Sequence, residues 1–216
     1  MARPMWSRVG VLVGALSFGQ VALGQQLLDR VLARVGSAAI TMTDVQVVVG
    51  LGMGLRQVSS DSATPALESV IDRRLVLDEV ARFPPPEPTE AAVAAEVASI
   101  RNRLGVRLSE LLATTGRDDE GMAALVRDTL RARAYIAQRF GTSAQVRDDD
   151  VRAYFDAHAE AFIRDGVKVP FEQAEDEARR LASADRLRIT IDAWIDDLRV
   201  RAEIVRVVPF TPALIR

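Results

Sequence analysis

The chain has 216 residues, of which 49% are apolar and 27% charged, a composition that argues against a wholly disordered chain, a collagen, a coiled-coil fibre or a polytopic membrane protein. Its 28 basic and 30 acidic side chains give a formal net charge of −2, which provides no general reason to expect a nucleic-acid partner. The chain lacks cysteine, which excludes disulfides, thiolate metal sites and thiol catalysis, and its single histidine disfavours histidine-based metal sites.

The first 24 residues have the pattern of a secretory signal peptide. A short basic start leads into an apolar run, and small residues follow at the spacing that signal peptidase recognises: Arg3, Arg8, Val9–Phe18, Ala22 and Gly24. The alternative is an uncleaved membrane anchor, which needs about 20 predominantly apolar residues. Because Gln20 interrupts the run early, the sequence favours a cleaved signal and export to the periplasm.

Residues 29–41 predict a β-hairpin around Gly36-Ser37, a glycine-first pair that suits a type II′ turn. The expected cross-strand pairs are Val35 with Ala38, Ala33 with Ile40, Arg34 with Ala39, and Leu32 with Thr41. A two-stranded hairpin alone is marginally stable in water. The one other strand-like run, 202–208 before Pro209, is expected to join the hairpin as a third strand.

Everything between these strands has helical periodicity. The expected helices are Val45–Leu55 after a start at Thr41–Asp44, Pro65–Phe83 capped by Thr64, a helix from Thr89 to Leu104 closed by Gly105, a short turn over Ser109–Thr114 closed by Gly116, Asp118–Phe140, Asp148–Phe162, a helix from Pro170 to about Leu181, and Ala184–Arg201. Gly50, Gly52 and Gly54 should weaken the first of these, since each costs about 1 kcal/mol relative to alanine. The predicted fold class is mainly α with a small terminal sheet.

The sequence offers little catalytic chemistry. It contains no glycine-rich phosphate loop, no Gly-x-Ser-x-Gly elbow and no His-Glu-x-x-His pair. His158 lies in a helical stretch without a visible catalytic partner. The acidic runs 148–150 and 118–120 could be proposed as metal ligands, but they fit helix N-termini better, because carboxylates there meet unpaired amides. We therefore expect no catalytic residue, no metal, no cofactor and no enzymatic activity.

Two groups of side chains remain as candidates for binding. Arg127, Arg131, Arg133 and Arg139 make one long helix basic, but in an acidic exported chain we expect them to be solvated, with their stems covering the core. Leu51, Met53 and Leu55 lie in the glycine-rich helix, and apolar residues of this kind suit surfaces that accept varied partners. They are the candidate peptide-binding residues, with core packing as the alternative.

Several segments, in their order, resemble the periplasmic chaperone SurA and its relatives. The segments are Asp29–Thr41, Ala66–Leu77, Val146–Phe162, Pro170–Glu172 and Trp194–Ile204. In that family a parvulin-type prolyl isomerase domain commonly separates the two halves. Here the eight residues Ile163–Pro170 stand in its place, and a domain needs about 50. The resemblance therefore implies the SurA N-terminal-like helical domain, closed by the hairpin and the C-terminal strand, without the isomerase.

The expected organisation is a signal peptide over 1–24, one SurA-like chaperone core over 25–209, and a tail over 210–216. The core would combine the hairpin and helices of 25–165 with the helices and returning strand of 166–209. By resemblance, its function would be that of a periplasmic holdase that binds unfolded or extended exported polypeptides, plausibly outer-membrane protein precursors. No nucleic acid and no stable membrane anchor are expected. The alternatives are a dedicated assembly partner of one exported protein, or a degenerate prolyl isomerase relative.

Overall fold

The computed structural model describes residues 29–55 and 63–207, so the predicted signal peptide and the tail lie outside the described residues. In chain order the elements are β1 (Val31–Val35), β2 (Ala38–Thr41), α1 (Met42–Gly50), α2 (Ala63–Arg82), α3 (Glu90–Leu104), α4 (Val106–Thr115), α5 (Asp119–Phe140), η1 (Gly141–Ala144), α6 (Asp148–Ala157), η2 (Ala159–Phe162), β3 (Ile163–Arg164), β4 (Val167–Lys168), α7 (Phe171–Arg201) and β5 (Ile204–Arg206). The predicted class, mainly α with a small terminal sheet, is confirmed.

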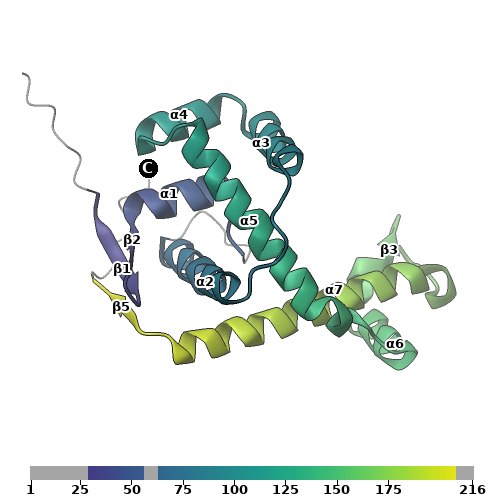
Figure 1. Ribbon diagram of the computed structural model, residues 1–216. Helices are drawn as coiled ribbons and strands as arrows, with labels where there is room; N and C mark the ends of the chain where they lie inside the picture. The colour runs from purple at the N-terminus through teal and green to yellow at the C-terminus, as the bar shows by residue number, and fades with distance from the viewer. Residues whose placement is uncertain (1–28, 56–62, 208–216) are drawn as a thin grey trace, which may run out of the picture.

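The two ends of the described chain meet in one antiparallel sheet of strand order β2-β1-β5 (Figure 1). The prediction that the C-terminal strand joins the hairpin is therefore confirmed. Main-chain hydrogen bonds outside the ladder extend the pairing at both ends, from the amide of Gly36 to the carbonyl of Glu203 at 2.9 Å and from the amide of Val207 to the carbonyl of Leu32 at 3.0 Å. The strand is shorter than predicted.

The hairpin register is correct over three of the four predicted pairs: Val35 with Ala38, Arg34 with Ala39, and Ala33 with Ile40. The fourth is wrong, because Thr41 pairs with Val31 and a bulge displaces Leu32. A bulge breaks the alternation of side chains along a strand. Leu32 and Ala33 consequently both point into the core, with 1% and 0% of their surface exposed.

Several helix boundaries differ from the predictions. Helix α1 ends at Gly50 rather than Leu55, and α6 ends at Ala157, where η2 takes over. Helix α2 already includes Thr64, so this residue is not its cap. Helix α4 has ten residues and begins earlier than the short turn of helix predicted over Ser109–Thr114. The local caps at Thr89 and Asp118 are confirmed, since each side chain accepts an amide of its own first turn.

Helix α7 is continuous over 31 residues, whereas the sequence predicted two helices with a break near 182–184. Its N-terminal part packs with α6, and its C-terminal part packs with α2 and α5. Two apolar clusters result, a large one around the sheet and α1–α5 and a small one formed by Val151, Phe155, Phe162, Ala174 and Ala178. The long helix bridges the two clusters (Figure 1), and its sequence contains no glycine or proline that would interrupt it.

The short segment Ile163–Pro170 contains a minimal hairpin of β3 and β4. Asp165 and Gly166 both have positive φ, 51° and 79°, which is the requirement of a type I′ turn. Asp-Gly is among the strongest short hairpin signals, and the sequence prediction did not use it.

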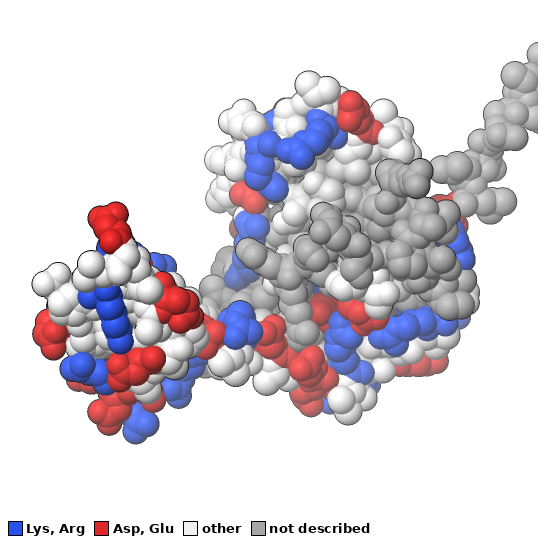
Figure 2. All heavy atoms as spheres, turned by 180° about the vertical axis from the view of Figure 1, so that it is seen from behind, with Lys and Arg blue, Asp and Glu red and all other residues white. Residues whose placement is uncertain are grey.

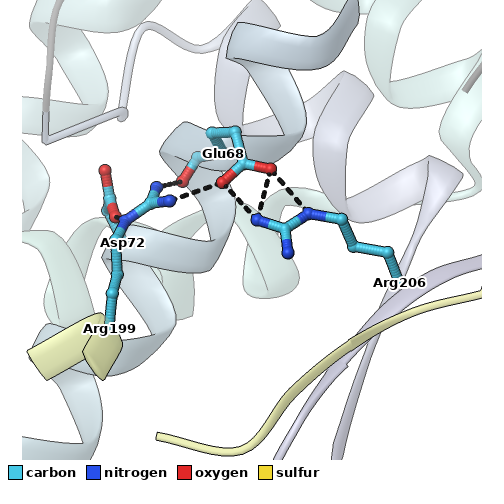
Figure 3. Close-up of polar contacts among 4 residues, drawn as sticks. All are labelled: Glu68, Asp72, Arg199 and Arg206. Atoms are coloured by element: carbon cyan, nitrogen blue, oxygen red, sulfur yellow. Dashed lines mark hydrogen bonds and ion pairs between the residues drawn. The ribbon is translucent and has the colours of Figure 1, made fainter. Parts of the chain in front are cut away.

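A charged network ties α2 to the C-terminal elements (Figure 3). The Nε of Arg199 on α7 donates to Asp72 Oδ1 at 2.5 Å, and its Nη1 donates to Glu68 Oε2 at 2.5 Å. Arg206 on β5 reaches the same Glu68 from the other side, with Nη2 2.9 Å from Oε1. Burial opposes the charged form of Arg199, but the hydrogen bonds to Asp72 and Glu68 outweigh it and raise its pKa. The network therefore locks the last strand and helix onto α2.

Candidate peptide-binding groove

An apolar groove of about 400 Å³ lies between α1 and α4, with the start of α2 at its base. Its lining residues come from these three helices: Val45, Gln46, Val49, Gly50, Ala66, Arg107, Glu110, Leu111, Thr114 and Thr115. The exposed lining is mainly apolar, with polar side chains at the rim. This volume lies within the range of sites that bind small ligands or a few side chains of a peptide. We take it as the candidate site and refer to it as the α1–α4 groove.

The capping of α1 and its ion pair with the α4–α5 connection hold one wall of the groove. The side chain of Thr41 accepts from the amide of Asp44, and the Asp44 carboxylate accepts in return from the amide of Thr41, so the predicted helix start is confirmed as a capping box. The other carboxylate oxygen of Asp44 pairs with Arg117 Nη2 at 3.0 Å. The N-terminus of α1 is thereby attached to the segment that follows α4.

Gly50 and Gly52 leave room for the ends of side chains from α4 and α3. A Cβ on Gly50 would lie 2.7 Å from Cδ2 of Leu111, so the end of the Leu111 side chain fills the space beside this glycine. Gly52 has a φ of 66°, and a Cβ there would lie 2.8 Å from Nη1 of Arg103. The same Arg103 donates to the carbonyl of Leu51 at 2.9 Å. The glycines predicted to loosen this segment in fact permit close packing.

The structure places two of the three candidate peptide-binding residues in the core. Leu51 is 0% exposed and Met53 is 3% exposed, whereas Leu55 is half-buried against the same cluster. Buried Arg73 also donates to the carbonyl of Met53, at 3.4 Å. The groove is thus lined by other residues of α1 and α4, and the role of the three in peptide binding stays a prediction.

Arginines of α5 face acidic residues of α3 and the preceding loop. Arg127 pairs with Glu90 at 2.8 Å, and Arg133 pairs with Glu96 at 2.9 Å. Arg131 pairs with Glu87 at 2.7 Å. Three of the four arginines are thus paired with carboxylates, whereas Arg139 donates to the Tyr135 hydroxyl at 3.3 Å and lies over the Trp194 ring. Figure 2 shows acidic and basic side chains interspersed in the same way over the smaller part of the molecule, which contains α6 and the start of α7, and over the lower edge of the larger part.

The remaining sequence candidates have structural roles. Asp150 accepts from the amide of Arg147 at 3.1 Å, and this hydrogen bond, with the nearby arginine charges, lowers the pKa of Asp150. His158 follows the last turn of α6, where its Nδ1 lies 3.0 Å from the carbonyl oxygen of Tyr154 and its ring stacks on the tyrosine ring. Across residues 29–55 and 63–207, no three histidine or carboxylate side chains gather closely enough to hold a metal ion.

The sequence prediction missed the groove because α4 was taken for a short turn. Leu111 and Thr115 lie one turn apart on that helix, as Val45 and Val49 do on α1, and this spacing puts each pair on one helix face. Pattern alone does not reveal that the two faces lie beside each other. At the place where they meet, the end of the Leu111 side chain lies against Gly50.

No protein-family model matches the chain, and no curated protein is similar to it at a significant level. Within the described residues, no helix is both long enough and apolar enough to span a membrane.

Proposed function

We propose that this protein is a periplasmic holdase, which binds extended apolar segments of unfolded exported proteins in the α1–α4 groove. The observation that carries the proposal is the groove itself, about 400 Å³ with a largely apolar lining from α1 and α4. Support also comes from the resemblance of the hairpin, α2 and the C-terminal elements to the SurA family, and from the signal-like first 24 residues. Outer-membrane protein precursors are the proposed clients, because their alternating apolar strands match such a groove.

Binding in this proposal needs no nucleotide and no covalent step. Apolar side chains of a client enter the groove and lose contact with water, which contributes about 25 cal/mol per Å² buried. Glu110 and Thr114 are exposed at the rim of the groove, so the polar groups of a client that lie beside them stay in contact with water. A shallow site of this kind favours weak, reversible binding, as a holdase requires.

Replacing Val49 by serine should weaken client binding about ten- to fifteenfold. The change removes two methyl groups from the groove lining, and each buried methylene-sized group contributes about 0.8 kcal/mol. The measurement is the concentration of protein that halves the aggregation of an unfolded outer-membrane β-barrel protein. The matched control is Val200→Ser, because Val200 is 86% exposed and lies on α7 outside the groove.

The proposal fails if Val49→Ser and Val200→Ser suppress aggregation equally well while both retain the circular dichroism spectrum of the unmodified protein. Suppression of several unrelated unfolded chains would distinguish a holdase from a dedicated assembly partner. A proline-isomerisation assay on a short peptide tests the remaining alternative.

Gly50→Ala should narrow the groove without unfolding the protein. The new Cβ would displace the terminal methyls of Leu111, which are the end of a flexible side chain, and a gain in helix propensity offsets part of that cost, although at the last residue of α1 it is smaller than the roughly 1 kcal/mol of a helix interior. We expect a several-fold loss of peptide affinity and a change in unfolding free energy within about 1 kcal/mol. In a Leu111→Ala background, Gly50→Ala should have no further effect on affinity; an equal loss in both backgrounds would contradict the steric explanation.

A further inference from the structure

We propose that residues 208–216 of this chain occupy the α1–α4 groove when no client is bound, so that the protein's own tail competes with its clients. The competition rests on the proposed function, but the docking of the tail does not. These residues lie outside the described ranges, and the argument uses the point where the described chain stops, their sequence and the chemistry of the groove.

The chain leaves the sheet close to the entrance of the groove. The amide of Val207 donates to the carbonyl of Leu32 at 3.0 Å, so the described chain ends beside the N-terminal half of β1. On the other side of β1, the carbonyl of Arg30 accepts from the amide of Met42, the first residue of α1, at 2.8 Å. The exit of the tail is therefore separated from α1 by about two interstrand spacings, roughly 10 Å.

The tail is long enough to follow the groove. Helix α1 has nine residues, which corresponds to a length of about 13 Å at 1.5 Å per residue. An extended chain advances about 3.3 Å per residue, so 208–216 can span about 30 Å. This exceeds the roughly 23 Å from the exit to the far end of α1.

The sequence of the tail is that of an extended apolar ligand. Its apolar side chains are those of Val208, Phe210, Ala213, Leu214 and Ile215. Pro209 and Pro212 fix φ near −65° and lack an amide, which favours an extended segment that needs fewer main-chain partners. These apolar side chains match the largely apolar lining of the groove.

The segment 56–62 is another candidate, and its composition argues against it. It contains three serines, an arginine, a glutamine and an aspartate around the single apolar residue Val58. Burying such a segment in an apolar groove would remove its polar groups from water without compensation. The tail is the better chemical match.

Cross-linking of engineered cysteines tests the docking directly, because the natural chain has none. The test variant carries Ala213→Cys in the tail and Thr114→Cys on the exposed rim of the groove. The control variant carries Ala213→Cys with Ala157→Cys, an exposed position on α6 outside the groove. Each is treated with a short bis-maleimide at low protein concentration, and the linked peptides are identified by mass spectrometry.

We expect an intramolecular 114–213 link in the test variant and at least tenfold less linkage in the control. Adding Leu214→Asp and Ile215→Asp should abolish the 114–213 link. Equal linkage in test and control overturns the proposal, as does a link found only between two chains, which would assign the groove to a second copy. An intact link in a protein that binds no unfolded client would retain the docking and reject the holdase function.

Removal of 208–216 gives the second measurement. If the tail fills the groove in nine of ten molecules, its removal raises the apparent affinity for an apolar fluorescent peptide about tenfold. Unchanged affinity in the truncated protein, with the circular dichroism spectrum intact, would contradict the competition. In the truncated protein, Val49→Ser should still lower peptide affinity, which separates loss of the competitor from loss of the site.

Discussion

Replacement of Arg199 by alanine is expected to lower the free energy of unfolding by about 3 kcal/mol. The guanidinium lies 2.5 Å from Asp72, whose side chain is 1% exposed, and 2.5 Å from Glu68. Removing one member of a buried charged pair costs about 3–5 kcal/mol, because the remaining charge stays in a medium that solvates it poorly. The lower end applies here since Arg199 itself is 23% exposed.

Arg201→Ala is the matched control for this prediction. Arg201 lies two residues further along α7 and pairs with Asp197 at 2.7 Å, but both side chains are more than half exposed. Exposed pairs contribute about 0–1 kcal/mol. Urea unfolding followed by circular dichroism should therefore separate the two variants by at least about 2 kcal/mol. Similar losses in both would mean that the Arg199 network contributes no more than a surface ion pair.

The same network explains why the C-terminal strand returns to the hairpin. A strand of three residues forms few ladder bonds, and a short pairing between distant parts of the chain must overcome the entropy of closing a long loop. Arg206 on β5 and Arg199 on α7 converge on Glu68 of α2, so side-chain contacts supplement the main-chain pairing. Arg199→Ala should accordingly loosen β5 as well as α7.

Local signals in the sequence predicted the parts of the fold that depend on neighbouring residues. The cap at Thr41, the caps at Thr89 and Asp118, and the left-handed Gly116 involve groups within four residues of each other. The turn at Gly36 belongs to the same class, since only its first central residue has positive φ, as type II′ requires. Such features are fixed by short-range hydrogen bonding and sterics.

The predictions that failed involve packing between distant segments. The bulge at Leu32 turns that side chain into the core, although strict alternation placed it on the other face. Helix α7 packs first against α6 and then against α2 and α5, so its buried face changes along its length. This change of face in the sequence pattern led to the prediction of two separate helices. Neither effect can be predicted from the spacing of apolar residues, whose period is 2 residues in a strand and 3.6 in a helix.

The groove was unpredictable for the same reason. Its walls come from two helices that are distant in the sequence, and one contact between them joins the end of the Leu111 side chain to Gly50. Because glycine has a low helix propensity, the sequence predicted that this helix packs poorly. In the structure, the absence of a side chain at Gly50 makes room for Leu111. The sequence could identify α1 as unusual, but it could not supply the partner helix.

Leu51→Ser is expected to lower the free energy of unfolding by about 3–5 kcal/mol, while Leu55→Ser should lower it by about 1 kcal/mol. Leu51 is 0% exposed and belongs to the main core, so its replacement removes buried apolar volume and places a hydroxyl there. Leu55 is half-buried and loses less apolar contact. Urea unfolding of the two variants checks the difference.

The variants Leu51→Ser and Leu55→Ser also distinguish core packing from client contact, the two roles that the sequence left open for these residues. If Leu51 acts only through the core, client affinity per folded molecule should be unchanged in Leu51→Ser once the folded fraction is restored with an osmolyte such as trimethylamine oxide. A direct contact would instead lower the affinity of fully folded protein. For Leu55→Ser, which stays folded without an osmolyte, reduced affinity would extend the client site from the α1–α4 groove toward the end of the glycine-rich segment.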